Sequence, residues 1–416
     1  MPVPVGVRPV SVHTGSLVRS GGGTNRLGRS LGPMEGVYLD HAASTPARPE
    51  VVEAMLPWLA EHPGNPSGAH AEARAARRAI DDARDLVAAL VGAQPGEVVF
   101  TSGGTEADNL AVDGVVRSTG RLPVCSAVEH PAVLAPVAEA GGIVVPTDAG
   151  GRIDLGALAE VLHAVGGIGL VSVMLANNET GVVNDLDAVA ALLVEAASDA
   201  VLHTDAVQAA AWMELEVACR GAGLVSLTGH KLGGPKGAGA LVVRSGVPLA
   251  PVLRGGGQER ERRSGTQNVP AIVGLGEAAR LVVADRATTV ERVGALRDRL
   301  EAGLLAVPGT RRTVPVGTPR TPAIAHICFE GVESESLLFL LERDGVSASA
   351  GSSCASGAQE PSHVLAAMGV ERGSALGSLR LSLGHASDDG DVDHALAVIR
   401  SAVSRLREHD PVGGSA

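Results

Sequence analysis

Two lysines in one glycine-rich stretch are the most unusual chemical feature of this sequence. Lys231 and Lys236 are the only lysines among 34 basic side chains, and both lie in SLTGHKLGGPKGAGALVV, residues 226–243. Arginine can replace lysine in ion pairs and phosphate contacts, but only a primary amine can form a Schiff base with an aldehyde. Because lysine is retained here and nowhere else, we expect Lys231 to be a covalent catalytic group. Two ordinary surface lysines are the alternative.

Polar side chains follow several strand-like runs, which is where a parallel sheet binds its ligands. TSGGTEADN, residues 101–109, combines two glycines with a helix start at Thr105. This pattern can hold an anion on free backbone N–H groups, although ordinary helix capping gives the same pattern. Asp205 ends the run VLHTDA. A carboxylate buried there needs a cation such as a protonated pyridine nitrogen, and a helix cap is again the alternative.

An amine nucleophile, an anion site and a strand-end carboxylate together predict a site for pyridoxal phosphate (PLP). This cofactor is held by a lysine and by an acid at its ring nitrogen, and it acts as an electron sink. A nicotinamide-dependent oxidoreductase receives no support, because the GxGxxG motif is absent. The sequence also lacks a Walker loop for a nucleoside triphosphate.

Elements that could position these groups alternate along the chain from Val37 onward. Short β-branched runs separated by amphipathic runs are typical of an α/β fold, and near-continuous apolar strands indicate a mostly parallel sheet covered on both faces. Expected helices cover residues 69–91, 185–198, 285–310 and 390–407. Expected strands cover residues 97–102, 143–147, 169–175, 200–206, 223–229 and 239–244.

Composition narrows the class of protein. With 416 residues, of which 45% are hydrophobic and 19% charged, the chain can bury a large core. A net charge of −12 disfavours direct nucleic-acid binding, and no apolar run is long enough to cross a membrane. The four cysteines, at positions 125, 219, 328 and 354, show no paired spacing. This pattern fits a reducing cytoplasm and suggests neither a disulfide framework nor a metal site.

The length of the chain favours two domains. A large PLP-binding domain would comprise residues 50–285, and a smaller α+β domain would comprise residues 35–49 plus 286–407. Residues 1–34 contain four arginines, no acid and many Gly, Ser and Pro. We expect them to form a disordered extension, with Met34 as a candidate for the true start. Residues 408–416 would form a frayed tail.

From about residue 37 to 405 the chain resembles the cysteine desulfurases of the class V aminotransferase group, in the branch of the iron–sulfur-cluster and nitrogen-fixation enzymes. The resemblance is nearly full-length and in order, which makes it more specific than any single motif. It implies an aspartate aminotransferase-like fold whose large domain has a mostly parallel seven-stranded sheet. It rests on YLDHAASTP (38–46), GNPSGAH (64–70), FTSGGTEADNLA (100–111), EHPAVL (129–134), VSVMLANNETGVV (171–183), HTDAVQ (203–208), TGHKLGGPKGAGAL (228–241), RGGGQERERRSGTQN (254–268), SAGSSCASGAQEPSHVL (349–365) and LRLSLGH (379–385).

The resemblance implies roles for residues around the cofactor. Lys231 would bind PLP covalently, while His130 would stack on the ring and help in proton transfer. Asp205 would pair with the ring nitrogen, and Gln208 would contact the ring hydroxyl. The implied phosphate ligands are Gly104, Thr105, Thr228, His230 and, from the other subunit of a homodimer, Thr266.

The same resemblance implies how L-cysteine would be bound and cleaved. Arg380 would hold the substrate carboxylate, assisted by Asn178, which would also contact the cofactor. Cys354, in the small-residue loop GSSCASG, would attack the substrate's sulfur and keep it as a persulfide while alanine leaves. Cys125 and Cys328 stand in apolar runs, which is typical of buried structural thiols.

Two alternatives to this function stay open at the level of sequence. A selenocysteine lyase, or another class V lyase or aminotransferase, would share the lysine, the aspartate and the phosphate site. A non-catalytic sulfur carrier or scaffold partner would lack some of the site residues, and none is missing. A protein sulfur acceptor is expected, but the sequence does not identify it.

Overall fold

The computed structural model describes residues 36–196, 198–350 and 362–409. The expected extension at residues 1–34 and the thiol of Cys354 therefore lie outside the described residues, as does most of the expected tail. Within the described part, α12 (Asp389–His409) includes the first two residues of that tail, so the helix continues further than expected.

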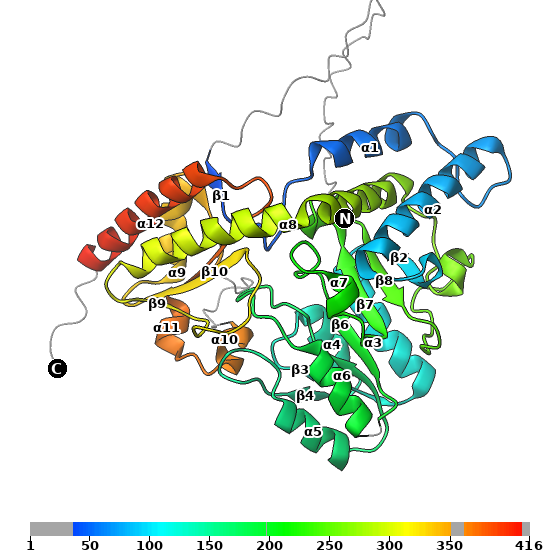
Figure 1. Cartoon of the computed structure of the whole chain (residues 1–416), viewed down its shortest axis with the longest axis horizontal. Helices are drawn as coiled ribbons and strands as arrows, with labels where there is room; N and C mark the ends of the chain where they lie inside the picture. The colour runs from blue at the N-terminus through cyan, green and yellow to red at the C-terminus, as the bar shows by residue number, and fades with distance from the viewer. Residues whose placement is uncertain (1–35, 197, 351–361, 410–416) are drawn as a thin grey trace, which may run out of the picture. The chain divides into compact units, whose positions relative to one another are not determined.

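The sheet that carries most of the predicted strand ends has seven strands in the order β2-β8-β7-β6-β5-β3-β4 (Figure 1). Only β8 runs antiparallel to its neighbours, and the other pairs are parallel. The predicted fold class, with a mostly parallel seven-stranded sheet, is confirmed. The strands are β2 (Val98–Thr101), β3 (Leu122–Ser126), β4 (Ile143–Val145), β5 (Ile168–Ser172), β6 (Val201–Asp205), β7 (Leu224–Thr228) and β8 (Gly239–Val243).

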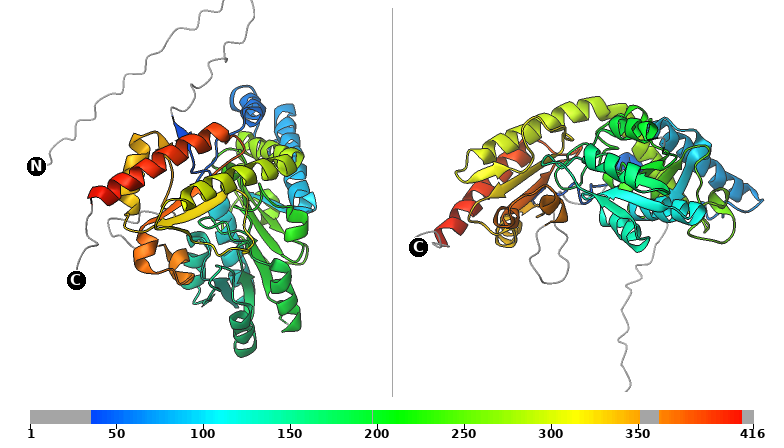
Figure 2. Two further views of the ribbon diagram at one scale, coloured as in Figure 1. Left: turned by 60° about the vertical axis from the view of Figure 1, so that its left-hand side comes forward. Right: turned by 90° about the horizontal axis from the view of Figure 1, so that it is seen from below.

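Helices cover both faces of this sheet, as the alternation of side chains along β8 shows. Ala240 and Val242 join a hydrophobic cluster with residues of α2 and α8, whereas Leu241 and Val243 join a cluster with residues of α3 and α4. Successive side chains of a strand point to opposite faces, so the two clusters lie on opposite sides of the sheet. The ribbons in Figure 2 show helices on both sides of it. The helices are α1 (Pro49–Ala60), α2 (Ala71–Val91), α3 (Gly104–Thr119), α4 (Pro131–Glu139), α5 (Leu155–Ala164), α6 (Leu186–Glu195), α7 (Leu215–Ala218) and α8 (Val269–Leu305).

A second set of strands has its own hydrophobic cluster, which includes Leu381, Val392 and Ile399. Strands β9 (Thr310–Arg312), β10 (Ile324–Phe329) and β12 (Ser378–Ser382) form an antiparallel sheet in the order β12-β10-β9. Strand β1 (Val37–Tyr38) pairs in parallel with β11 (Val346–Ser347), which brings the start of the described chain beside the segment that follows α9 (Ser334–Arg343). The remaining helices are α9 (Ser334–Arg343), α10 (His363–Ala367), α11 (Arg372–Leu376) and α12.

Two elements differ from expectation for identifiable reasons. Helix α8 begins at Val269 and not near residue 285. The earlier start was not predicted from the sequence, because the first half of the helix is buried on several sides and shows no single apolar stripe. Strand β3 was not among the expected strands, and it contains Pro123. Proline is tolerated there because the ladder to β5 shifts register between Leu122 and Pro123.

Neither membrane crossing nor disulfide bonding is seen in the part of the chain that the structure describes. None of the helices there combines the length and apolarity that a bilayer requires. Cys125, Cys219 and Cys328 are free thiols and are buried, as expected for the first and the last of them.

Close packing at the start of β8 gives a first testable prediction. A Cβ at Gly239 would lie 2.6 Å from the carbonyl carbon of Gly103, in the loop before α3. Gly239→Ala should therefore lower the free energy of unfolding by about 1–3 kcal/mol, measured by denaturant titration. Gly166→Ala is the matched control, because nothing lies within 4 Å of its added Cβ. An equal effect of both changes would contradict this packing.

Candidate active site

A cavity of about 400 Å³ lies at the carboxyl ends of β6 and β7. Asp205 ends β6, Thr228 ends β7, and Lys231 follows in the 3-10 turn η2 (Gly229–Lys231). They meet there because neighbouring parallel strands end at the same edge of the sheet. The predicted site residues that line the cavity are Gly104, Thr105, His130, Asn178, Asp205, Gln208, Thr228, His230, Lys231 and Arg380.

Lys231 carries an amine that loses its proton easily. Burial, together with the nearby charge of Arg380, lowers its pKa from 10.5 to about 8, and Asp205 opposes this shift. Nζ donates hydrogen bonds to the carbonyl oxygens of Ala42 and Ala43, the latter at 2.8 Å. A larger neutral fraction near neutral pH is what attack on an aldehyde carbon requires.

Asp205 presents a buried carboxylate to the cavity. One of its oxygens, Oδ1, accepts from the backbone N–H of Val207 at 2.8 Å. Burial raises its pKa to about 6, and the charge of Lys231 acts in the opposite direction. A cationic ring nitrogen beside it would offset the cost of burying the charge. Gln208 donates from Nε2 to the carbonyl oxygen of Ala42 at 2.7 Å, so the carbonyl that binds Lys231 also orients this amide.

The first turn of α3 suits an anion. The helix begins at Gly104, one residue before the expected start. A side chain does not fit at Gly104, because an added Cβ would lie 2.9 Å from Cγ2 of Val207. Free N–H groups and the helix dipole favour negative charge there. The charge of Glu106 in the same turn is offset by Arg263, whose Nε donates to it at 2.7 Å.

Two histidines at the cavity are neutral at pH 7. Burial and the charge of Lys231 lower the pKa of His130, and they lower that of His230 to about 4. Nδ1 of His130 accepts from the backbone N–H of Ala132 at 3.1 Å, so its proton is on Nε2. His230 lies beside the hydroxyl of Ser44, 3.4 Å from Nδ1 to Oγ.

Arg380, on β12, is held in one orientation above the cavity. Nη1 donates to the carbonyl oxygen of Asn178 at 3.0 Å, and Nη2 donates to Oδ1 of Asp40 at 2.7 Å. Its Nε is buried and has no hydrogen-bond partner among the described residues. Because Asn178 binds through its backbone, its part here is to orient the guanidinium, which can then bind a carboxylate.

Several cavity residues were missed by sequence reasoning. Asp108 lies four residues after Gly104, one turn further along α3, and this spacing could have identified it. Ala42 and Ala43 act through backbone carbonyls, so their side chains gave no signal. The unpredicted lining residues are Ala42, Ala43, Asp108, Met174, Val207 and Ser349.

A buried histidine beside Asp108 is uncharged. Nε2 of His203 lies 3.7 Å from Oδ1 of Asp108 and 3.0 Å from the hydroxyl of Ser226, while Nδ1 contacts the hydroxyl of Ser172 at 2.8 Å. Burial lowers the pKa of His203 to about 3. Burial and the charge of Asp205 raise the pKa of Asp108 well above its usual value. His203 is therefore neutral at pH 7, and the environment of Asp108 opposes its ionisation.

Glu129 is a second buried acid in this region. Its Oε1 accepts from the hydroxyl of Ser126 at 2.6 Å and from the N–H of Met174 at 2.7 Å. Its Oε2 is buried without a hydrogen-bond partner in the described part of the chain. Burial raises its pKa from 4.5 to about 8, and the charge of Asp205 adds to the effect.

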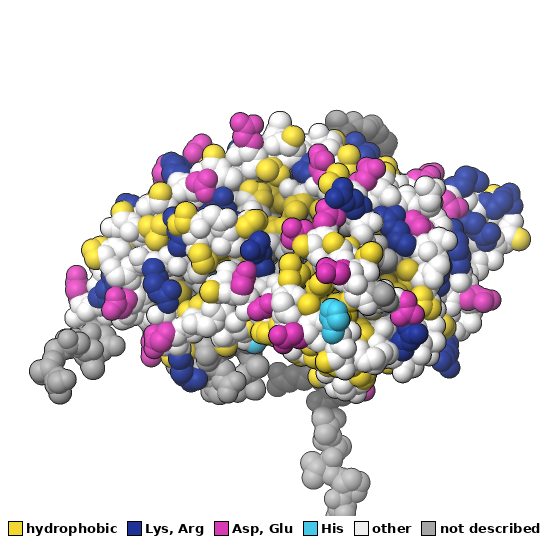
Figure 3. Space-filling view, turned by 60° about the horizontal axis from the view of Figure 1, so that its bottom comes forward, with side chains coloured by type: hydrophobic (Ala, Val, Ile, Leu, Met, Phe, Trp, Pro, Cys, Tyr) yellow, Lys and Arg dark blue, Asp and Glu magenta, His cyan; other side chains and the backbone are white. Residues whose placement is uncertain are grey.

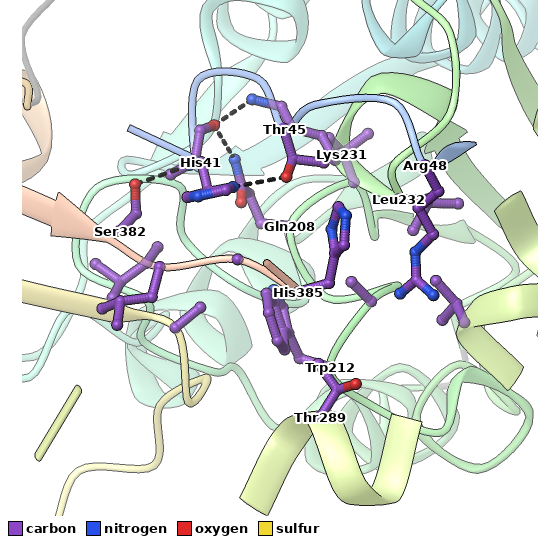
Figure 4. A pocket seen from close by; sticks show the side chains of 18 of the residues that line it. His41, Thr45, Arg48, Gln208, Trp212, Lys231, Leu232, Thr289, Ser382 and His385 are labelled. Carbon is purple, nitrogen blue, oxygen red and sulfur yellow. Dashed lines mark hydrogen bonds between the residues drawn. The ribbon is translucent and has the colours of Figure 1, made fainter. Parts of the chain in front are cut away.

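A second, smaller cavity of about 30 Å³ is also lined by Lys231 and Gln208 (Figure 4). Both cavities are lined by Ala42, Val207, Gln208 and Lys231. Two histidines of this cavity, His41 and His385, are also neutral, since burial lowers the pKa of each to about 4. The hydrogen bonds to the carbonyl of Ala42 thus lie at the boundary between the two cavities.

Among the predicted site residues that the structure describes, Thr266 is the one that does not line the main cavity. Thr266 lies in the loop between the 3-10 helix η3 (Gln258–Glu261) and α8, where it is exposed. Cys354 falls in residues 351–361, outside the described residues. The role of each stays a prediction.

The cavity has the donor set that PLP requires. An amine of lowered pKa, a carboxylate that favours a cationic partner and a helix N-terminus surround one space. The volume lies in the usual range for small-molecule sites. These residues could hold an aldehyde at Lys231, a ring nitrogen at Asp205 and a phosphate at α3.

The chain is similar to known proteins over most of its length. The model of the family "Aminotransferase class-V" matches residues 37–395. The chain is 44% identical over 383 residues to the IscS-like cysteine desulfurase of Mycobacterium tuberculosis, covering 89% of this chain and 97% of that protein. It is 42% identical over 384 residues to the cysteine desulfurase IscS of Methanosarcina thermophila, covering 90% and 94%. Among solved structures it is similar to a NifS-like protein, with a TM-score of 0.83 and 31% identity over 89% of this chain and 100% of that one.

The buried acid Glu129 gives a testable pH dependence. Its pKa in the folded protein exceeds the ordinary value, so folding favours the protonated form, and stability should fall as pH rises from about 4.5 to about 8. Glu129→Gln keeps one acceptor oxygen and cannot ionise. As pH increases from 5 to 8, the melting temperature of the variant minus that of the wild type should increase by roughly 2–4 °C. Calorimetry measures both temperatures. The exposed Glu261→Gln is the control, and a pH-independent difference for Glu129→Gln would contradict a protonated Glu129.

Proposed function

The chain belongs to the class V aminotransferase family, among its cysteine desulfurases, and from this premise we propose that it converts L-cysteine to L-alanine with PLP and places the sulfur on Cys354. The observation that carries the proposal is one cavity bordered by an amine of lowered pKa, a buried carboxylate, a helix N-terminus and an oriented arginine. A non-catalytic carrier would not need this combination.

Within this proposal, separate residues hold the aldehyde carbon, the ring and the phosphate of the cofactor. Lys231 forms the covalent link, Asp205 meets the ring nitrogen, and Gln208 meets the ring hydroxyl while His130 stacks on the ring. When bound, PLP supplies the electron sink that makes cleavage of the substrate's C–S bond feasible. The phosphate ligands would be Gly104, Thr105, Thr228 and His230, with Thr266 from the other subunit.

Arg380 and Asn178 are proposed to bind the substrate carboxylate. The guanidinium is oriented by Asp40 and by the carbonyl of Asn178, and Arg380 lines the cavity. Burial strengthens such a charge-assisted pair, because little water competes for the donors.

The protonation states assign directions to proton transfer. The lowered pKa of Lys231, about 8, gives its Nζ a larger neutral fraction than an ordinary lysine has, and the neutral amine can accept the proton from the substrate's Cα. The neutral His130 carries its proton on Nε2, so this atom can donate a proton. Nε2 can accept a proton only after it has given up its own. We therefore assign removal of the proton to Lys231.

Cys354 is the proposed sulfur carrier. Its thiolate attacks the sulfur of the substrate, an S–S bond forms, and the C–S bond breaks with its electron pair left on carbon. Protonation of that carbon yields alanine, so no external oxidant is consumed. A protein acceptor would then take the sulfur. Ser349, which lines the cavity, precedes residues 351–361 in the chain.

We also propose a cytoplasmic homodimer of two-domain subunits, with domains at residues 50–285 and at residues 35–49 plus 286–407. Three buried free thiols support a reducing compartment. Separate hydrophobic clusters around the two sets of strands support the domain division. Acidic and basic side chains are interspersed over one face of the molecule (Figure 3), which supports a protein partner better than a nucleic acid.

The covalent role of Lys231 is tested by a change that keeps its charge. Lys231→Arg should lose the visible absorption band of the lysine-linked cofactor and all desulfurase activity, because a guanidinium does not form the link. Lys236→Arg, the matched control, should retain both. The measurements are absorbance after dialysis against PLP and mass spectrometry after borohydride reduction. A yellow, active Lys231→Arg variant would refute the assignment.

The reaction itself is tested by product stoichiometry. With PLP, L-cysteine and a reductant, wild type should form alanine and sulfide in equal amounts, and Cys354→Ser should form neither. Cys219→Ala alters a buried thiol and should form both products. Alanine formed equally by wild type and Cys354→Ser would favour a lyase of the selenocysteine type. No alanine from wild type, with or without an added thiol acceptor, would exclude cysteine as the substrate.

A further inference from the structure

The loop that leads to Thr266 contains a strained backbone. Glu259, Arg260 and Glu261 have φ values of 48°, 57° and 64°, and they are the only non-glycine residues with positive φ in the described part of the chain. Side chains with a Cβ are disfavoured in this left-handed region, and three in a row persist only where surrounding contacts hold them. Strain of this kind is concentrated at functional sites, so the contacts that hold the loop are of interest.

Glu259 holds this strained turn from inside the protein. Its side chain is 1% exposed, and its carboxylate accepts two hydrogen bonds from the guanidinium of Arg84, at 2.7 and 3.0 Å. The backbone N–H of Phe100, on β2, donates to it at 3.0 Å. Arg84 in turn lies over the ring of Phe100, 4.6 Å from its centroid. The turn is therefore fixed to α2 and β2, two elements of the large sheet and its cover.

Two further hydrogen bonds cross the loop on either side of Thr266. Nε2 of Gln267 donates to Glu259 at 2.6 Å, and the N–H of Gly265 donates to Oε1 of Gln258 at 2.9 Å. Both neighbours of Thr266 are thus tied back to the strained turn, while Thr266 itself is exposed and does not line the cavity of its own subunit. A residue fixed on both sides and left exposed is oriented toward something outside its own chain.

We propose that Glu259 is a positioning residue for the other subunit: it holds the strained turn so that Thr266 meets the cofactor phosphate of the partner. This inference rests on the proposed function, in which Thr266 acts across a homodimer. Glu259 contacts neither cofactor nor substrate. Its effect is expected on cofactor affinity in the partner's site, and not in the site of its own chain.

Crossed hybrid dimers separate these two sites. Subunits with different affinity tags are co-expressed, and a Lys231→Ala change marks one site as unable to form the covalent link. PLP is titrated into the purified hybrid, and the lysine-linked cofactor is measured by absorbance and by mass after borohydride reduction. In homodimers, Glu259→Gln should raise the dissociation constant of PLP about tenfold, because the loss of charge-assisted hydrogen bonds frees the loop. Glu261→Gln, an exposed acid of the same turn, should leave it within about twofold.

The arrangement of the two changes then decides between the sites. With Glu259→Gln on the subunit that keeps Lys231, the only linked site meets Thr266 from an intact loop, so its affinity should return to within about twofold of wild type. With Glu259→Gln and Lys231→Ala on the same subunit, the linked site meets the altered loop, and its affinity should stay about tenfold weak. The reverse pattern means that Glu259 acts within its own chain, and it overturns the inference.

Two further variants distinguish a failure of this inference from a failure of the proposed function. Gln267→Ala removes the hydrogen bond between Gln267 and Glu259 and keeps the Arg84–Glu259 pair, so it should give the same crossed pattern. This variant replaces Glu259→Gln in the test if that protein does not fold. Thr266→Ala tests the proposed function alone. A within-chain pattern for Thr266→Ala, or a monomer by light scattering, overturns the proposed dimer contact and this inference with it. A crossed pattern for Thr266→Ala but not for Glu259→Gln or Gln267→Ala overturns the inference only.

Discussion

The site depends on keeping one amine out of water beside a guanidinium. Lys231 is lowered in pKa by its burial and by Arg380, and it stays in place because the carbonyls of Ala42 and Ala43 accept its hydrogen bonds. These partners come from segments far apart in the chain, at the start of the described residues, after β7 and on β12. The two sets of strands must therefore both fold before the amine acquires its reactivity.

The same exclusion of water limits how much negative charge the region can hold. Asp108, Glu129 and Asp205 are all buried, and the charge of Asp205 adds to the rise in pKa that burial causes at the other two. Asp205 lines the cavity, as Lys231 does. Its pKa rises to about 6, which is a smaller rise than that of Glu129, whose pKa is about 8. The neutral His203 adds no cation to relieve the others. Negative charge in this region is thus favoured at Asp205 over Glu129.

Residues whose side chains carry chemistry at strand ends could be predicted from sequence, and residues that act through the backbone could not. Lys231 and Asp205 stand out by type and position, whereas Ala42 binds the amine of Lys231 with a carbonyl that every residue possesses. Six of the seven strands of the large sheet were found because their apolar runs are short and bounded, and β3 was not. The start of α8 was missed because burial on several sides removes the periodicity from which a helix is recognised.

Helix α8 runs without interruption for 37 residues, about 55 Å, and contributes to both hydrophobic clusters. Ala278 and Val282, in its first half, pack in the cluster of the large sheet, and Leu296 and Leu300 pack in the other. A single residue inserted between these pairs would rotate the second half by about 100° relative to the first. The two clusters are therefore held in phase by helical pitch, so natural variants of this length should tolerate substitutions along α8 far better than insertions or deletions within it.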